Sequence, residues 1–137
     1  LNNKIDESYG KAKVDYRERY ITEIKNEMLY TQQLIDLQRS NASRDRATLM
    51  SKGVRFGKNG VMQNLDDVYA LKVAQINALP ETTTDQNTAN RKKALKEELD
   101  ALKELAEAYD EERENIQSLQ ESLESLSKSR KDAYDGT

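Results

Sequence analysis

The stretch from Leu95 to Ala133 decides the fold, and it reads LKEELDALKELAEAYDEERENIQSLQESLESLSKSRKDA. Apolar residues recur in it at steps of three and four, beneath a dense coat of carboxylates. These residues are Leu99, Leu102, Ala106, Tyr109, Ile116, Leu119, Leu123, Leu126 and Ala133. Such spacing puts side chains on one face of an α-helix, and a stripe this narrow is typical of a coiled-coil seam. We therefore expect a long acidic helix within residues 89–137 that buries this seam against another helix.

The alternation of steps breaks once in this stretch, at Arg113. The step from Arg113 to Ile116 is three residues, and the step from Ile116 to Leu119 is three again. A break of this kind either overwinds a supercoil locally or shows that the helix changes partners there. We favour the second interpretation.

Composition also favours extended helices over a large globular core. Charged residues make up 34% of the 137 residues, the mean hydropathy is -0.96, and there is one Pro, one Phe and no Trp. Such a chain is too polar to wrap a large core, whereas its content of helix-forming residues suits long helices. Cys is absent, which excludes disulfides and thiol catalysis. Because the chain begins with Leu1 instead of Met, we expect it to be a segment of a longer protein.

A second seam is expected in a long N-terminal helix over residues 1–50. Its apolar positions repeat every seven residues, at Val14, Ile21, Met28, Ile35, Ala42 and Leu49. A neighbouring stripe has the same period and contains Tyr9, Tyr16, Tyr30 and Leu37. A broad apolar face with polar interruptions suits packing against more than one helix.

Residues 51–64 contain the signal for a small β-hairpin. Two short β-compatible runs, Val54–Phe56 and Val61–Gln63, flank the sequence Gly57-Lys58-Asn59-Gly60. An Asn-Gly pair between such runs favours a type I′ turn, in which both central residues have positive φ. The expected turn residues are therefore Gly57, Asn59 and Gly60.

A short helix over residues 65–80 and a polar linker over residues 81–88 are expected to follow. Asn64 is placed to cap the short helix, Pro80 ends it, and Asn87 or Thr88 is placed to cap the last helix. The expected fold class is all-α: long helices that form a coiled-coil-like helical hairpin or bundle, with a small β-hairpin at one tip. The interaction residues expected in the seams are Ile21, Met28, Ile35, Leu99, Leu102, Tyr109, Ile116, Leu119, Leu123 and Leu126.

No arrangement of residues in the sequence indicates an enzyme. Histidine is absent, and it is the common acid–base group near neutral pH and the commonest metal ligand. Adjacent carboxylates such as Asp110, Glu111 and Glu112 splay around a helix instead of converging on one ion. The segment Gly53–Lys58 has three residues between its glycines where a phosphate-binding P-loop needs four. We expect no catalytic residue, no cofactor and no metal, and we see neither a membrane span nor a signal peptide.

The two parts of the chain carry opposite net charge. Residues 1–60 contain 12 Lys and Arg against 8 Asp and Glu, and the remainder contains 10 against 17, which gives balances of +4 and -7. Opposite fields favour packing of the two parts against each other or against further copies, so a homo-oligomer is expected. The rival interpretation is a basic nucleic-acid surface, but Asp15 and Glu18 interrupt the basic residues from Lys11 to Arg19. Direct binding of nucleic acid is therefore not expected.

The order of the motifs is also informative. A long charged helix leads into Phe56–Gly60 and Asn64–Tyr69, and another long helix follows with Lys96–Leu102 and Tyr109–Glu112. In this order and style, residues 20–135 resemble helical segments of tail tape-measure proteins from long-tailed bacteriophages and prophages. The resemblance implies a structural virion protein that packs inside the tail tube, sets tail length and has no active site in this segment. It also implies partners among further copies or other virion proteins, in the virion tail or in the host cytoplasm during assembly.

Two other classes remain open. One is a non-enzymatic cytoplasmic coiled-coil adaptor or scaffolding protein that docks partner helices. The other is a nucleic-acid-associated helical protein that uses the basic first half, whose affinity for DNA would fall steeply with salt.

Overall fold

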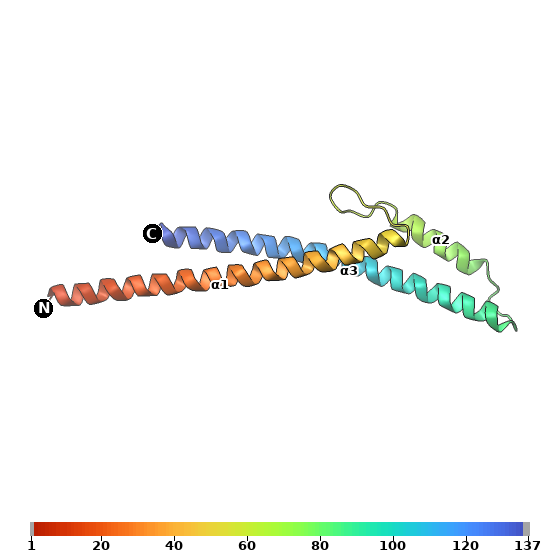
Figure 1. Cartoon of the computed structure of the whole chain (residues 1–137), viewed down its shortest axis with the longest axis horizontal. Helices are drawn as coiled ribbons and strands as arrows, with labels where there is room; N and C mark the ends of the chain where they lie inside the picture. Colours follow the sequence, from red (N-terminus) through yellow and green to blue (C-terminus); the bar gives the residue numbers. More distant parts are fainter. Residues whose placement is uncertain (1, 136–137) are drawn as a thin grey trace. The chain divides into compact units, whose positions relative to one another are not determined.

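The computed structural model describes residues 2–135, with side chains from residue 7 to residue 135, and this part of the chain forms three α-helices (Figure 1). Helix α1 is Asn2–Ser51, α2 is Leu65–Asn77 and α3 is Gln86–Tyr134. The chain divides into two units. We call Ser40–Arg113 the central unit, and the chain up to Arg39 together with the chain from Glu114 onward the terminal unit. Helices α1 and α3 pass through both units, and the expected all-α class is confirmed.

In the terminal unit, α1 packs against the C-terminal part of α3, and the two helices run antiparallel (Figure 1). On α1, Ile24, Thr31 and Ile35 are buried, while Ile21 and Met28 are half-buried. The facing residues of α3 are half-buried, namely Ile116, Leu119, Leu123 and Leu126. Because these positions are spaced three and four residues apart, they lie along one face of each helix. The expected packing of the two long helices is therefore confirmed.

A second stripe on α1 stays open to solvent. It consists of Tyr9, Tyr16, Tyr30 and Leu37, which expose 72%, 75%, 63% and 55% of their surface, and we call it the tyrosine stripe. Each member lies two residues after a position in the heptad register of Met28, as Tyr30 lies two residues after Met28 itself. Two residues rotate the direction of a side chain around the helix by about 200°. Measured from the middle of the seam, which lies between the positions of Met28 and Thr31, the offset of the tyrosine stripe is about 130°. The stripe therefore lies on an outer flank of α1 that stays exposed, and one member, Tyr16, lines a hollow together with Ala133 of α3.

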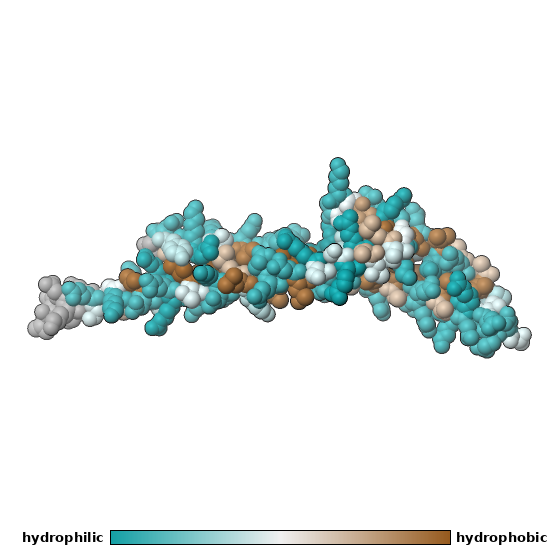
Figure 2. Space-filling model, in the orientation of Figure 1, coloured by the Kyte–Doolittle hydropathy of each residue, from teal (hydrophilic) through white to brown (hydrophobic). Residues whose placement is uncertain are grey.

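In the central unit, α2 packs along the N-terminal part of α3 (Figure 1). Ile76 of α2 forms a buried cluster with Leu95 and Leu99 of α3, and Tyr69 and Leu79 pack against this cluster. Further buried apolar residues of this unit are Ala42, Leu49, Val54, Leu102, Ala106 and Tyr109. On the face shown in Figure 2, apolar residues occupy narrow bands between wider polar surfaces. The central unit ends at Arg113, where the spacing of apolar residues along α3 breaks.

The expected β-hairpin is wrong, because residues 2–135 contain no β-strand. The chain does reverse direction, with a single antiparallel bridge between Phe56 and Met62. The amide of Arg55 donates instead to Asn64 Oδ1 at 2.7 Å, and Asn64 Nδ2 donates to the carbonyl of Gly53 at 2.9 Å. These two backbone groups would have extended the ladder toward α1. Because the Asn64 amide binds both, the ladder stops after one bridge.

The expected turn type is also wrong. Gly60 has the expected positive φ of 79°, but among the described residues no position other than a glycine has positive φ, which excludes Asn59. A type I′ turn with Asn59 and Gly60 at its centre needs both. The turn instead closes through a hydrogen bond of 3.0 Å from the Gly60 amide to the Gly57 carbonyl, and the Gly57 amide donates to Val61 O at 2.8 Å.

The helix caps also differ from the sequence expectation. Asn64 precedes α2 but makes no capping hydrogen bond with its side chain, because that side chain binds the loop. Helix α3 begins at Gln86 and is capped by Asp85, whose Oδ1 accepts from the Asn87 amide at 3.1 Å. The other carboxylate oxygen accepts from the Thr88 hydroxyl at 2.8 Å. Thr88 therefore supports the cap from inside the first turn instead of forming it.

Candidate functional site

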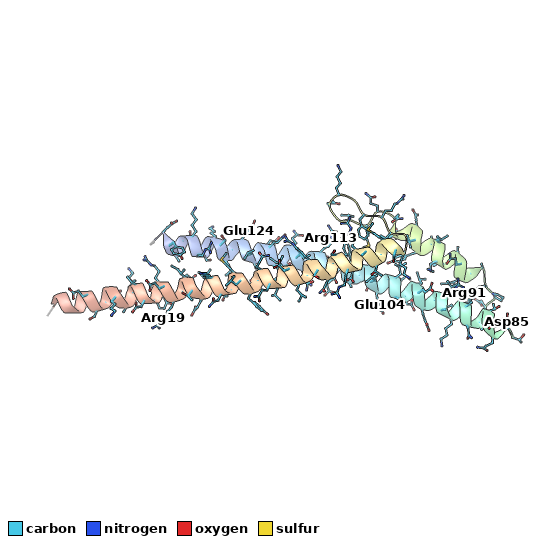
Figure 3. The ribbon with its side chains drawn as sticks, viewed as in Figure 1. Arg19, Asp85, Arg91, Glu104, Arg113 and Glu124 are labelled. Atoms are coloured by element: carbon cyan, nitrogen blue, oxygen red, sulfur yellow. The ribbon has the colours of Figure 1, made fainter. Side chains whose placement is uncertain are left out.

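Two side chains of α3 hold the turn of the central unit. The Tyr109 hydroxyl donates to the Gly60 carbonyl at 2.7 Å, and Arg113 Nη2 donates to the Asn59 carbonyl at 2.8 Å. Figure 3 shows Arg113 on α3 beside this loop. We call Phe56, Asn59, Gly60, Tyr109 and Arg113 the tip clamp. Its two hydrogen bonds join residues that are 49 and 54 positions apart in the sequence, and they fix the loop against α3.

Aromatic contacts extend the tip clamp to α1. The Phe56 ring meets the Tyr109 ring edge to face, with centroids 5.2 Å apart and an angle of 72°. The Arg46 guanidinium of α1 lies over Phe56 at 5.0 Å, and that of Arg113 lies 5.9 Å from the Tyr109 ring. Such pairs stabilise by about 1 kcal/mol each. α1, the loop and α3 are therefore joined by one connected set of contacts.

Gly60 is a position where an added side chain would crowd the clamp. A Cβ atom there would lie 3.1 Å from the Tyr109 hydroxyl oxygen and 3.4 Å from Arg113 Nε. Its φ of 79° is also a conformation that residues with a Cβ rarely adopt. Lys58, in the same turn, is exposed. The geometry therefore makes Gly60 structural, and it leaves Lys58 outside the clamp.

Glu112 directly precedes Arg113 on α3. Its carboxyl group meets that of Asp45 on α1. Its Oε2 atom is buried, and it has no hydrogen-bond partner while both carboxyl groups are ionised. Burial, a hydrogen bond with Asp45 and the charge of Asp45 together raise the pKa of Glu112 from 4.5 to about 7. The charge of Arg44 acts in the opposite direction. Near neutral pH, this contact between α1 and α3 therefore exists in both protonation states.

Polar contacts attach α2 to α3. Lys72 Nζ lies 3.0 Å from Glu98 Oε2, and its hydrogen bond and charge lower the pKa of Glu98. Lys92 Nζ donates to the Leu79 carbonyl at 3.1 Å, where α2 has ended. Lys103 lies over the Tyr69 ring at 5.8 Å. These contacts orient a short helix whose one buried residue is Ile76.

The seam residues expected from the sequence fall into two groups. Within the central unit Leu99, Leu102 and Tyr109 are at most 8% exposed. In the terminal unit only Ile35 is as deeply buried, and the other seam positions are half-buried. Tyr109 was expected to be a seam residue alone, yet its hydroxyl also holds the loop. Arg113 is a charged residue at a position where the spacing of α3 calls for an apolar one. This was the one signal for the tip clamp in the sequence.

The acidic residues of the central unit do not converge on an ion site. Asp66, Asp67 and Asp110 line a hollow of about 460 Å³ together with residues 61–65. Within the part of the chain that the structure describes, no group of three or more side chains is placed to hold a metal ion. Among the same residues, no helix combines the length and the apolar character that a membrane crossing requires.

The comparisons with known proteins identify no family for this chain. No protein-family model, no curated protein and no solved structure matches it.

Proposed function

We propose that this chain is a structural segment of a tail tape-measure protein, and that it acts by packing its helices and not by catalysis. The observation that supports this proposal is the use of two long helices of 50 and 49 residues, each of which buries one narrow stripe. Helices of this kind set distances between the proteins at their ends, because each residue adds about 1.5 Å.

The polar residues of the central unit agree with a mechanical role. Tyr109 and Arg113 bind backbone carbonyls, and Lys72 binds Glu98. Each of these groups has its partner within the protein itself. Their arrangement therefore supports rigidity of the loop and of α2, and offers no set of groups aimed at a substrate.

The test is made in the phage or prophage whose gene contains this sequence. In-frame deletion of the segment, and its in-frame duplication, are compared with the parent by electron microscopy of the tails. We expect the deletion to shorten the tail and the duplication to lengthen it, by at most roughly 200 Å for 137 residues in helical form. Tails of unchanged length in both variants would exclude the tape-measure role.

A cytoplasmic adaptor or scaffold is the second candidate, and the exposed tyrosine stripe on α1 favours it. An adaptor docks partner helices on such a face. In that case the chain is absent from purified particles, and both variants alter assembly yield while leaving tail length unchanged. Mass spectrometry of purified particles, made beside the microscopy, therefore separates the two candidates.

A further inference from the structure

Asn59 and Gly60 lie in the loop of the central unit, and nowhere else in the sequence does glycine directly follow asparagine. Asparagine is one of the thermolabile residues. The backbone nitrogen of the following residue can attack its side-chain carbon Cγ, and glycine at that position has no Cβ to hinder the attack. Asn59 is exposed, so water has access to its side chain. The sequence therefore makes Asn59 the asparagine of this chain that is most prone to deamidation.

The folded loop holds the reacting atoms in place. The Gly60 amide, whose nitrogen would attack, donates to the Gly57 carbonyl at 3.0 Å. Arg113 binds the Asn59 carbonyl, which belongs to the same peptide group as that nitrogen, and Tyr109 binds the carbonyl of Gly60 itself. The tip clamp thus fixes the chain on both sides of the Gly60 nitrogen. This nitrogen can reach Cγ of Asn59 only after the turn and the clamp have opened.

We propose that Asn59 is a site of spontaneous deamidation, and that the tip clamp sets its rate by holding the loop closed. In the open loop, the Gly60 nitrogen gives its proton to water and bonds to Cγ of Asn59. The bond from Cγ to Nδ2 breaks, and Nδ2 leaves as ammonia with a proton taken from water. Another water molecule then opens the succinimide ring at either of its carbonyls, which gives aspartate or isoaspartate at position 59. The rate is therefore proportional to the fraction of molecules in which the loop is open.

The two products differ in their effect on the clamp. Aspartate at position 59 leaves the path of the backbone unchanged. Isoaspartate leads the backbone through the former side chain, so an additional carbon atom separates Cα of residue 59 from the Gly60 nitrogen. The turn between Gly57 and Gly60 then no longer has the length that its hydrogen bond requires. Isoaspartate at position 59 therefore keeps the loop open.

The rate is measured on the purified chain, and the proposal does not depend on the tape-measure role. The protein is aged near neutral pH, and a protease that cleaves after arginine releases residues 56–91 as one peptide. Mass spectrometry locates each deamidated asparagine in this peptide, and chromatography separates the aspartate and isoaspartate forms. Protein unfolded in guanidinium chloride is expected to lose the Asn59 amide at least about tenfold faster than the folded parent.

Variants of the clamp test its control of the rate. Arg113→Gln is expected to speed deamidation at Asn59 about tenfold, and Tyr109→Phe several-fold, because each removes a hydrogen bond that closes the loop. Arg91→Gln is the matched control, since Arg91 is an exposed arginine of α3 outside the tip clamp (Figure 3), and it is expected to keep the parent rate. Circular dichroism reports whether each variant keeps its helices. Asn77, in the same peptide, is expected to stay intact in all folded variants.

The products are tested by unfolding in urea. Asn59→Asp is expected to unfold at the same urea concentration as the parent, whereas the aged fraction with isoaspartate at position 59 is expected to unfold at a lower one. The proposal is overturned if the folded parent loses the Asn59 amide as fast as the unfolded protein, or if neither clamp variant loses it faster than Arg91→Gln. An isoaspartate fraction as stable as the parent would contradict the effect on the clamp.

Discussion

Gly60 couples the loop to α3 through its backbone. Its carbonyl accepts from the Tyr109 hydroxyl, and the space beside its Cα is occupied by that same hydroxyl and by Arg113. A side chain at this position would therefore compete with the clamp and would also have to adopt a φ of 79°.

Gly60→Val is expected to lower the free energy of unfolding by about 2–3 kcal/mol, from backbone strain and from the displaced hydrogen bond. Urea unfolding followed by circular dichroism measures this change. Lys58→Ala is the control, and an exposed turn lysine is expected to change stability by less than about 0.5 kcal/mol. Similar losses in the two variants would contradict the account of the clamp. The helices themselves are expected to remain, so the ellipticity of the folded Gly60→Val protein should match the parent.

Glu112 gives the central unit a pH dependence of a defined sign. Its pKa is about 7 in the folded protein and 4.5 as its ordinary value, so between these pH values the folded state binds more protons than the unfolded state. Stability from this group is therefore fully present below about pH 4.5 and is lost as the pH rises through 7.

Glu112→Gln is expected to remove this dependence, because glutamine stays neutral and can still donate to Asp45. Comparison of the free energies of unfolding of the parent and of Glu112→Gln at several pH values isolates the effect. With solvent screening, we expect the difference between the two proteins to change by about 1 kcal/mol across this range. Glu114→Gln is the control, because Glu114 is an exposed carboxylate of α3 whose charge is not among the causes that raise the pKa of Glu112, and it should show no such change. Parallel pH profiles for the parent and Glu112→Gln would show that Glu112 is not the group responsible.

At the scale of the element, α3 is buried unequally along its length. In the central unit it packs among α2, the loop and the end of α1, whereas in the terminal unit it packs against α1 alone. Leu102 is accordingly 4% exposed, and Leu123 is half-buried. A single neighbouring helix covers only one side of a side chain, so equal spacing does not imply equal burial.

Leu102→Ala is therefore expected to destabilise the protein by about 3 kcal/mol, and Leu123→Ala by only about 1 kcal/mol. Thermal and urea unfolding of the two single variants measures the contrast. Leu71→Ala serves as the control, because Leu71 is 63% exposed on α2 and should change stability little. Equal losses at positions 102 and 123 would mean that the seam is uniform, against the burial seen here.

At the scale of the whole molecule, the structure is 83% helical and contains no β-strand in its described residues. Circular dichroism in dilute buffer is expected to show a helix content near this value, with the strong paired minima of long helices. The outcome that contradicts the fold is a helix content below about half, since helices as long as α1 and α3 depend on tertiary packing for their stability.

The sequence by itself determined that three helices form, and their expected bounds lie within three residues of the observed ones. The three-and-four spacing of α3 and the heptad of α1 depend only on the pitch of a helix, so they can be read without knowing any partner. Pro80 likewise stops α2 through its own ring. The break in spacing at Arg113 coincides with the end of the central unit.

The tertiary structure alone decided how deeply each part of the seam is buried and how the loop folds. Leu102 and Leu123 follow one spacing along α3, yet only Leu102 is fully covered, because spacing does not tell how many neighbours surround a residue. The side chain of Asn64 could either cap α2 or bind the backbone of the loop at Gly53 and Arg55. In the packed structure it binds the loop. The turn departs from type I′ where Tyr109 and Arg113 hold its carbonyls, from about fifty positions away. Local turn preferences amount to about 1 kcal/mol, and contacts of this kind contribute at least as much, so distant residues override the local signal.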